Sequence, residues 1–559
     1  MLHPGVADQA LVDAVLRAVG ITEVPEVVPG WEPPWDNGTT VVITYADSIR
    51  RPGEVPLQTL RGFIRHELAG RVDTVHVLPF FPWSSDDGFA VIDHRAVDPA
   101  LGTWGDVTRL GDEVDLMADL VVNHVSAASP WFEQFVSDRE PGRRYLKTAD
   151  PAADLSAVVR PRTHGLLRAV QTVNGERHLW CTFGPDQIDL DYDEPDVLCE
   201  LLGTVDRLVS AGVRWLRLDA VAYVFKEVGT ECIHLPRTHE LVRLLRTLLA
   251  VRAPGTVVLT ETNVPHEENL SYLGDGDEAH VVYNFSLPPL LVHGFLSESP
   301  TALRHWLASN EPTPTGTTLL NFIASHDGLG VRPVEGLLSD PEIDALASRA
   351  VASGGLVSYY ATPTGERPYE LNVSLFDLLG GPDGEVGVTR YLAAHTVMLA
   401  VRGVPAFYLH SLLGTPNDLE GVAARGISRA VNRRKLGVDE LDSLLAADGG
   451  LRRGVLTELL RRIEVRGRLG ALHPDSPQQV VDVGPGVFGV LRGAGSAWDP
   501  VLCLTNMTSD RVGLDTDLLA TVLGGRPVDR LGEISAATDP RRLGPFQSTW
   551  LSASTAARS

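Results

Sequence analysis

The chain has little cysteine, and its cysteines are not clustered. Its 559 residues include only Cys181, Cys199, Cys232 and Cys503, which lie far apart in the sequence. They form no CxxC pair and no cysteine–histidine spacing that would hold zinc. We therefore expect reduced cysteines that are buried as small side chains, without a disulfide framework or a structural zinc site.

Long apolar runs, a basic start and an excess of positive charge are also missing. The first twenty residues contain Asp8 and Asp13 and lack the basic segment and apolar run of a secretory signal, and no later stretch reaches membrane-spanning length. The 48 Lys and Arg residues are outnumbered by 72 Asp and Glu, which gives a formal net charge of -24. Because nucleic-acid affinity comes mainly from cationic side chains, we expect a cytoplasmic protein that binds neither nucleic acid nor a membrane.

The sequence does contain a repeated alternation of short β-branched runs and amphipathic stretches. Eight such runs are VVITYA from Val41, TVHVLPF from Thr74, LMADLVV from Leu116, VRWLRLDAV from Val213, TVVLTET from Thr256, HVVYNF from His280, TLLNFIASHD from Thr318 and VPAFYLH from Val404. This alternation is typical of parallel βα units, and eight of them predict an α/β fold with a (β/α)₈ TIM barrel. Apolar residues at three- and four-residue spacing predict helices over 57–68 and 238–252.

The gaps between these runs are uneven and predict how the chain is divided. The long Pro-, Ser- and charge-rich gap after the third run is too long for an ordinary loop. The predicted parts are an N-terminal arm (1–40), the barrel (41–125 and 184–470), an inserted domain after strand 3 (126–183), a second insertion after strand 7 (328–386) and a C-terminal antiparallel β domain (471–559). We expect both insertions to lie over the carboxyl-terminal face of the barrel, where TIM-barrel enzymes keep their active sites.

Charged and polar residues follow the carboxyl ends of several predicted strands. They are Asp119, Asn123 and His124 in DLVVNHV, Arg217 and Asp219 in RLDAVAY, Glu261 in LTETN, and His326 and Asp327 in ASHDG. Side chains at this end of a barrel strand point into its mouth, so these groups should converge. A structural ion pair or a helix cap is the other interpretation of any one acid taken alone. Together they suit glycoside chemistry, which needs a nucleophilic carboxylate and a carboxyl of raised pKa.

These four segments resemble the signature regions of the α-amylase superfamily, glycoside hydrolase family 13, in their order and strand positions. The resemblance implies that Asp219 is the nucleophile, Glu261 the general acid/base, and Asp327 the third carboxylate, which grips sugar hydroxyls. Arg217 would orient Asp219 and lower its pKa, since a nearby cation favours the ionised form.

The same resemblance assigns His124 and His326 to hydroxyls of the donor glucose, and it implies no cofactor. Many amylases bind calcium through the Asn of the first region. Because the other calcium ligands are not recognisable in this sequence, we expect no metal here and a hydrogen-bonding role for Asn123.

Longer segments resemble the sucrose phosphorylase subfamily: VHVLPFFPWSSDDGFAVIDH, VVRPRT, FGPDQIDLDY, KEVGTECIHLP, FSLPPLLVHGF and SHDGLGVRP. The resemblance implies that Asp86, Phe89, Gln187 and Arg433 contact the donor glucose. For Arg433 a solvated basic segment is the alternative interpretation, because several basic residues lie close together between 425 and 435.

The residues implied on the phosphate and acceptor side are Arg162, Arg367, Tyr369 and Asn263. A guanidinium matches the oxygens of phosphate, although a surface ion pair would also account for Arg162. Thr163 stands where sucrose phosphorylases have Pro, which argues against fructose as the acceptor. VVRPRT, TNVPHEEN, CIHLPRTH and ERPYELN look more like the glucosylglycerate phosphorylases, whose acceptor is the anion glycerate. Arg367 would then meet the glycerate carboxylate, unless it is a solvated loop arginine.

The combined prediction is a retaining glycoside phosphorylase that uses a small-molecule glucoside and inorganic phosphate. Two inverting steps through a β-glucosyl-aspartate would give α-glucose 1-phosphate and the free acceptor. Sucrose phosphorylase and glucosylglycerol phosphorylase activities are the near alternatives. An α-glucoside hydrolase would use the same carboxylates with water, and a non-catalytic amylase-like binding protein typically loses one of them. The expected partners are these small molecules and a second copy of the chain in a homodimer.

Overall fold

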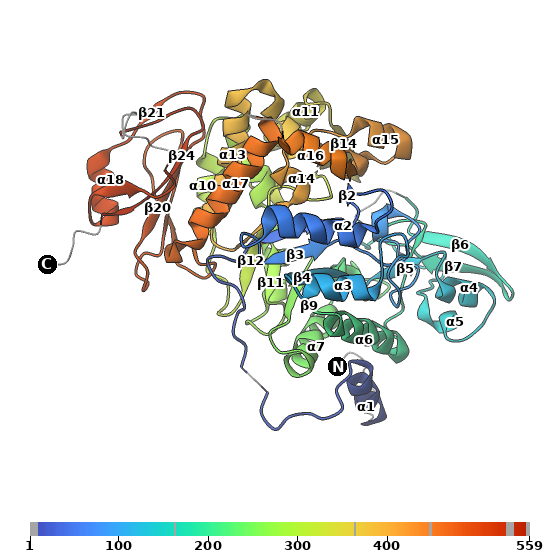
Figure 1. Cartoon of the computed structure of the whole chain (residues 1–559). Helices are drawn as coiled ribbons and strands as arrows, with labels where there is room; N and C mark the ends of the chain where they lie inside the picture. The colour runs from blue at the N-terminus through green and yellow to red at the C-terminus, as the bar shows by residue number, and fades with distance from the viewer. Residues whose placement is uncertain are drawn as a thin grey trace.

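Eight parallel strands close into one barrel in a computed structural model that describes residues 9–28, 30–160, 164–362, 365–446, 450–532 and 541–554. Their order around the barrel is β1, β3, β4, β9, β10, β11, β12 and β16, and β16 pairs again with β1 (Figure 1). The strands are β1 Val41–Thr44, β3 Thr74–Val77, β4 Asp115–Val121, β9 Val213–Asp219, β10 Val257–Thr260, β11 Val281–Tyr283, β12 Thr318–Asn321 and β16 Val404–Tyr408. Each of the eight predicted runs supplies one strand, so the predicted TIM barrel is confirmed.

Helices cover the outside of the barrel and explain why its strands are continuous apolar runs. With side chains inside and helices outside, both faces of each strand are buried. The covering helices include α2 Pro56–Phe63, α3 Trp104–Gly111, α6 Pro195–Ser210, α7 Pro236–Arg252, α9 Leu287–Leu296, α10 Thr301–Ser309, α13 Glu385–Ala400 and α17 Leu451–Gly467. A π-helical turn, Ile64–Leu68, continues α2, so the predicted helices over 57–68 and 238–252 are both confirmed. A proline begins α2, α6 and α7, where its missing N–H leaves no hydrogen bond unmade.

The segment between β4 and β9 forms two small antiparallel pairs at one side of the barrel (Figure 1). Its elements are β5 His124–Ser126, α4 Pro130–Val136, α5 Gly142–Tyr145, β6 Leu167–Thr172, β7 Gly175–Trp180 and β8 Gln187–Asp189. Strand β5 follows the end of β4 and pairs with β8, with Ser126 opposite Gln187. This pairing brings Gln187 next to the mouth of the barrel.

The segments after β12 and β16 lie over the barrel mouth. After β12 come β13 Leu329–Gly330, α11 Asp340–Ala352, β14 Leu356–Thr362, β15 Gly365–Asn372 and α12 Leu375–Leu378. β15 pairs antiparallel with both β13 and β14, so the chain just after Asp327 is hydrogen-bonded to the β14–β15 hairpin. After β16 come α14 Leu409–Leu412, α15 Leu419–Arg425, a 3₁₀ segment Ser428–Asn432, β17 Leu436–Gly437 and α16 Val438–Ala446. β17 pairs with β2 Ile49–Arg50.

An antiparallel sheet follows the barrel, as predicted for the C-terminal part of the chain. Its order is β18 Gln478–Val480, β19 Val487–Arg492, β20 Val501–Asn506, β24 Ser548–Ala553 and β22 Pro527–Asp529. The short pair β21 Val512–Gly513 with β23 Arg542–Leu543 and helix α18 Thr516–Leu523 complete this region. Arg492 is fully buried and donates a hydrogen bond of 2.7 Å to the carbonyl of Ala400, which ties β19 to the end of α13.

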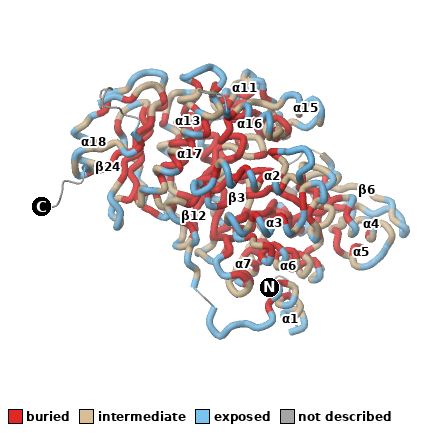
Figure 2. The backbone as a smooth tube through the Cα atoms, in the orientation of Figure 1, coloured by how far each residue is buried: buried red, intermediate tan, exposed pale blue. Residues whose placement is uncertain are grey.

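Buried residues follow the barrel strands and the core of the C-terminal sheet, whereas the outer loops are exposed (Figure 2). The N-terminal helix α1 Gln9–Ala18 packs against α6 on the outside. Across the parts of the chain described here, none of the helices combines the length and the apolar character needed to pass through a bilayer.

Candidate active site

A cavity of about 80 Å³ lies at the carboxyl ends of the barrel strands. Most of the residues predicted for the site line it: Asp86, Phe89, His124, Gln187, Arg217, Asp219, Glu261, Asn263, His326, Asp327 and Tyr369. The other lining residues are Phe183, Ala220, Tyr223, Thr262 and Arg429. The fold therefore brings together side chains that are up to 343 residues apart in the sequence, from Asp86 to Arg429.

Arg217 is the centre of a buried ionic network on β9. Arg217 and Asp219 are two residues apart on one strand, so their side chains lie on the same face. The Nη1 of Arg217 donates to Asp219 Oδ1 at 2.7 Å and also to Asp119 Oδ1 on the neighbouring strand β4. His76 Nε2 on β3 donates to the other oxygen of Asp119 at 2.7 Å. Asp219, the candidate nucleophile, is thus held by Arg217, and Arg217 is itself held by Asp119.

Glu261 lies across the cavity from Asp219 and is held by main chain. Its Oε2 accepts a hydrogen bond of 3.2 Å from the N–H of Ala220 and lies 4.0 Å from Arg217 Nη2. Ala220 has a φ of 54°, a left-handed conformation that is strained for a residue with a Cβ. The strained residue directly after Asp219 therefore orients the neighbouring carboxyl.

Burial raises the pKa of both carboxyls, so each keeps its proton to higher pH than an exposed carboxyl would. Burial raises the pKa of Asp219, and the nearby charge of Glu261 raises it further, although Arg217 opposes both. Burial likewise raises the pKa of Glu261, helped by the charge of Asp327. The sequence predicted that Arg217 gives Asp219 a lowered pKa; the net direction is the opposite, because burial outweighs the cation. Because Arg217 bonds Asp219 directly and lies 4.0 Å from Glu261, the cation favours ionisation of Asp219 more than that of Glu261.

Asp327 is surrounded by cations. Its Oδ1 lies 2.8 Å from Arg429 Nη1 and accepts a hydrogen bond of 3.2 Å from Arg433 Nη2. Burial opposes ionisation, but Arg429, His326 and Arg433 together hold the pKa of Asp327 well below its usual range. Asp327 is therefore ionised at any working pH.

Arg433, predicted to contact the sugar, is not among the residues that line the cavity. Its side chain is completely buried, its Nη1 donates to Asp87 Oδ2 at 2.7 Å, and the same nitrogen lies 3.5 Å from Asp86 Oδ1. Its Nε donates to the carbonyl of His326 at 2.9 Å. Arg433 therefore acts on the cavity through the residues it holds: Asp86, His326 and Asp327.

Aromatic and imidazole rings form the wall on the side of Asp86. The rings of Phe89 and His326 stack with centroids 5.1 Å apart and an angle of 8° between planes. His124 Nε2 donates to the carbonyl of Phe89 at 3.0 Å and lies 3.1 Å from Gln187 Nε2. Burial lowers the pKa of His326 to about 3, and both its ring nitrogens lack a hydrogen-bond partner among the described residues. A neutral, unpaired imidazole in a cavity wall is suited to binding a ligand hydroxyl.

Only some of the residues predicted for the acceptor side line the cavity. Tyr369 and Asn263 line the cavity. Arg367 does not: its Nη2 bonds Asp340 Oδ2 at 2.8 Å, and 43% of its side chain is exposed. Arg162 lies outside the described residues. The guanidinium that does line the cavity near Tyr369 is Arg429, to which the sequence assigned no role.

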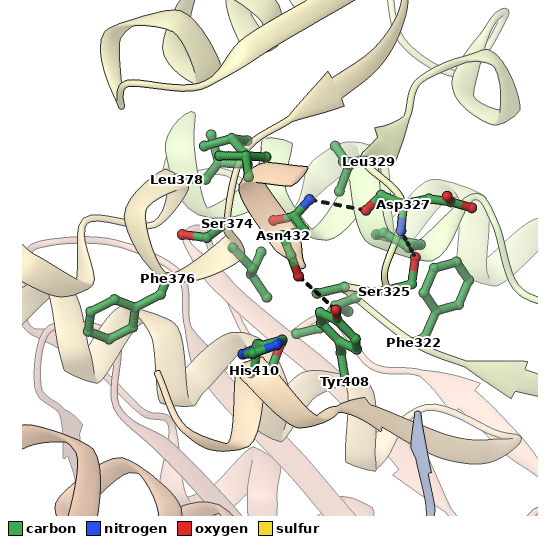
Figure 3. A pocket seen from close by; sticks show the side chains of 18 of the residues that line it. Phe322, Ser325, Asp327, Leu329, Ser374, Phe376, Leu378, Tyr408, His410 and Asn432 are labelled. Carbon is green, nitrogen blue, oxygen red and sulfur yellow. Dashed lines mark hydrogen bonds between the residues drawn. The ribbon is translucent and has the colours of Figure 1, made fainter. Parts of the chain in front are cut away.

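A second chamber of about 60 Å³ adjoins the cavity and shares Glu261, Asn263 and Asp327 with it (Figure 3). Phe322, Leu329, Phe376 and Leu378 give it a largely apolar lining. The main chain of Asp327 is fixed at its edge: its carbonyl accepts from Asn432 Nδ2 at 3.2 Å, and its N–H donates to Ser325 Oγ at 3.2 Å. The chamber thus backs the loop that carries Asp327.

The side-chain oxygen of Asn123 accepts a hydrogen bond from a buried lysine. Its Oδ1 accepts a hydrogen bond of 2.8 Å from Lys226 Nζ, which also pairs with Asp189 at 2.8 Å, and all three side chains are buried. This agrees with the hydrogen-bonding role predicted for Asn123. In the described part of the chain, no group of three or more His, Cys, Asp or Glu side chains is arranged to hold a metal ion.

The closed barrel, with carboxyl groups at the ends of β9 and β10 and after β12 and a strand arginine between Asp119 and Asp219, defines the class of α-amylase-type enzymes that act on glycosides. The family described as alpha amylase, catalytic domain, matches residues 68–311.

Relatives narrow the class. Glucosylglycerate phosphorylases of Spirochaeta thermophila and Allomeiothermus silvanus are 43% and 41% identical to this chain; the alignments cover 85% and 92% of this chain and 81% and 91% of those proteins. The solved structure of sucrose 6F-phosphate phosphorylase from Thermoanaerobacter thermosaccharolyticum superposes with a TM-score of 0.73 at 26% identity, covering 84% of this chain and 94% of that one. The chain therefore belongs to the sucrose phosphorylase subfamily of the α-amylase superfamily. It is a glucoside phosphorylase, a glycosyltransferase-type enzyme.

Proposed function

We propose that this enzyme cleaves 2-O-α-glucosylglycerate with inorganic phosphate to give α-glucose 1-phosphate and glycerate, with retention of configuration. The observation that carries the chemistry is that Asp219 and Glu261 both lie beside Arg217 in the cavity, with 2.7 Å between Arg217 Nη1 and Asp219 Oδ1 and 4.0 Å between Arg217 Nη2 and Glu261 Oε2. In this proposal the two carboxyls hold one proton between them. The choice of glycerate rests on the two glucosylglycerate phosphorylases above, which align along most of their length.

In the first step the ionised Asp219 attacks the anomeric carbon of the glucoside. The bond from that carbon to the glycosidic oxygen breaks as Glu261 gives its proton to the oxygen, so glycerate leaves with its hydroxyl restored. The glucose remains bound to Asp219 as a β-glucosyl ester. Arg217 aids this step because it stabilises the carboxylate that attacks and later departs.

In the second step an oxygen of phosphate attacks the same carbon from the opposite side. The ester bond to Asp219 breaks, and the proton of the attacking phosphate passes to Glu261, which restores the starting enzyme. Each step inverts the anomeric centre, so the product is the α-anomer.

Three further residues hold the glucose in this scheme. Asp327, ionised because arginines surround it, accepts hydrogen bonds from two neighbouring hydroxyls and gains strength as positive charge develops on the ring. The unpaired ring nitrogens of His326 meet other hydroxyls, and His124, whose Nε2 donates to the carbonyl of Phe89, borders the glucose. Their neutral state suits this role, since burial lowers the pKa of both rings.

In this proposal the acceptor is an anion in both directions, phosphate in one and glycerate in the other, and both would enter on the side of the cavity that Tyr369 and Asn263 line. Tyr369 and Asn263 supply polar contacts there. Arg162, which the sequence assigns to this side, would supply the charge that a net-negative enzyme needs to admit an anion.

A phosphorolysis screen tests the proposal. Purified enzyme with phosphate is offered 2-O-α-glucosylglycerate, sucrose or α-glucosylglycerol, and both glucose 1-phosphate and free glucose are measured. We expect glucose 1-phosphate from glucosylglycerate at a rate at least about tenfold above the other two. Faster cleavage of sucrose would overturn the acceptor, and free glucose without glucose 1-phosphate would make the enzyme a hydrolase. Asp219→Asn is the inactive control.

A further inference from the structure

Arg429 joins three parts of the site that are remote in sequence. It stands in the 3₁₀ segment Ser428–Asn432 after β16 and lines the cavity, with 17% of its side chain exposed. Its Nη1 is 2.8 Å from Asp327 Oδ1. Its Nη2 and Nε donate to the two carboxyl oxygens of Glu370, at 2.7 and 3.1 Å. One planar cation thus binds Asp327 with one edge and the β14–β15 hairpin with another.

Glu370, which forms the hairpin side of the contact with Arg429, is buried. Only 3% of it is exposed, and it directly follows Tyr369 on β15. A Cβ on Gly328, the residue after Asp327, would be 2.6 Å from Glu370 Cγ and 2.7 Å from the carbonyl of Leu371, so only glycine allows this close approach. The N–H of Val331 donates to the carbonyl of Tyr369 at 3.1 Å. The hairpin and the Asp327 loop are therefore packed as one unit.

We propose that Arg429 is a positioning residue which, through Glu370, couples the acceptor-side hairpin to Asp327, the carboxylate that grips the donor glucose. A change in the hairpin when acceptor or phosphate binds beside Tyr369 is then transmitted to the glucose site by one guanidinium. This inference rests on the proposed function, because it takes the role of Asp327 from there.

The contacts and the charge of Arg429 suit it, more than Arg433, to connect the β14–β15 hairpin with Asp327. Arg433 also bonds Asp327, but it is tied to Asp87 and to the carbonyl of His326 and has no contact with the hairpin among its described bonds. Of the cations around Asp327, Arg429 contributes most to holding its pKa down, against the cost of burial. Loss of Arg429 should therefore disturb both the placement and the ionisation of Asp327.

The test uses α-glucosyl fluoride, because fluoride is too small to reach the hairpin and its release reports only the glucose site. Glu370→Gln keeps the size of the side chain but weakens its hold on Arg429, and we expect it to lower kcat/KM for fluoride release about tenfold. Glu335→Gln is the matched control: it removes another carboxylate that holds the same hairpin, through Tyr360 at 2.8 Å, but has no contact with Arg429. It should leave fluoride release within about twofold.

A double-mutant cycle supplies the second arm. In the Arg429→Lys background, which keeps the charge but not the fork, Glu370→Gln should have little further effect, because both changes break the same link. Multiplicative effects, or unchanged fluoride release in Glu370→Gln, would overturn the coupling. Wild-type fluoride release that disappears in Asp219→Asn supports the proposed function whatever the result at Glu370.

The pH profile separates positioning from a general loss of structure. The charged and titratable groups that face Asp327 among the described residues are Arg429, Arg433, His326, Arg217, Glu261, Tyr45 and Tyr408. In Arg429→Gln the pKa of Asp327 should rise, so the acid limb of kcat/KM should move to higher pH than in wild type, whereas Glu370→Gln, which keeps the Arg429 cation, should leave this limb where it lies in wild type. An unchanged acid limb in Arg429→Gln would overturn the assignment of Arg429 to Asp327.

Discussion

Arg217 donates a hydrogen bond of 2.7 Å to Asp219 Oδ1 from the same face of β9. A guanidinium so close to one carboxylate, and farther from the second, makes the two acids of the pair unequal. This inequality suits the two roles in the proposed mechanism, since one acid must be an anion and the other a proton donor when the glucoside binds.

Glu261→Gln tests the proton donor. The amide cannot protonate a sugar or glycerate oxygen, so phosphorolysis of 2-O-α-glucosylglycerate should fall by at least about a hundredfold. Release of fluoride from α-glucosyl fluoride needs little protonation and should be largely retained. Both rates are measured with the same enzyme preparation, and an equal loss on the two substrates would contradict the assignment.

The pH dependence follows from the raised pKa of Glu261. A carboxyl with a raised pKa keeps its proton to higher pH, so the activity that needs this proton is present below that pKa and lost as the pH rises through it. For wild type we expect an alkaline limb of kcat/KM with 2-O-α-glucosylglycerate that lies well above the range of an ordinary glutamic acid. With α-glucosyl fluoride and Glu261→Gln, this limb should be absent; its persistence would assign the proton to another group.

Arg162→Ala tests the phosphate contact implied by the sequence. The loss of a charge-assisted hydrogen bond costs roughly 1.5 to 3 kcal/mol, or about ten- to a hundredfold in the phosphate-dependent step. Fluoride release, which needs no phosphate, should change by less than about threefold. The measurement is the apparent KM for phosphate at saturating glucoside. An unchanged KM together with slow fluoride release would place Arg162 on the glucose side.

Lys226→Met tests the buried pair under Asn123. Removing the ammonium leaves the buried carboxylate of Asp189 without its cation, and breaking such a pair costs about 3 to 5 kcal/mol of unfolding free energy. Lys147→Met is the control, because Lys147 pairs with Asp191 and Asp193 nearer the surface, and it should cost no more than about 1 kcal/mol. Urea denaturation compares the two. Equal losses of unfolding free energy would show that Lys226 contributes no more to stability than Lys147 does.

The sequence alone predicted the barrel and the residues that gather in its mouth. Continuous apolar runs with charged ends are what a two-face-buried parallel strand produces, and the carboxyl ends of such strands all meet on one side of a barrel. For this reason Arg217, Asp219, Glu261 and Asp327 were identifiable one strand at a time.

Contacts between segments that are far apart in the chain could not be predicted from the sequence. Arg429 and Glu370 are 59 residues apart, one in a 3₁₀ segment and the other on β15, so no periodicity relates them. Regular alternation would place Arg367 on the same face of β15 as Tyr369, but the pairing of β14 with β15 shifts register between Ser358 and Tyr359, and Arg367 bonds Asp340 on α11 instead.

Net electrostatics were also decided by the tertiary structure. The neighbouring Arg217 suggested a lowered pKa for Asp219, but how far burial opposes that cation depends on how much solvent the folded chain excludes. The sequence by itself determined which groups meet and their chemical types. Only the tertiary structure decided how deeply they are buried and which of them pair, because desolvation and long-range contacts exist only once the chain has folded.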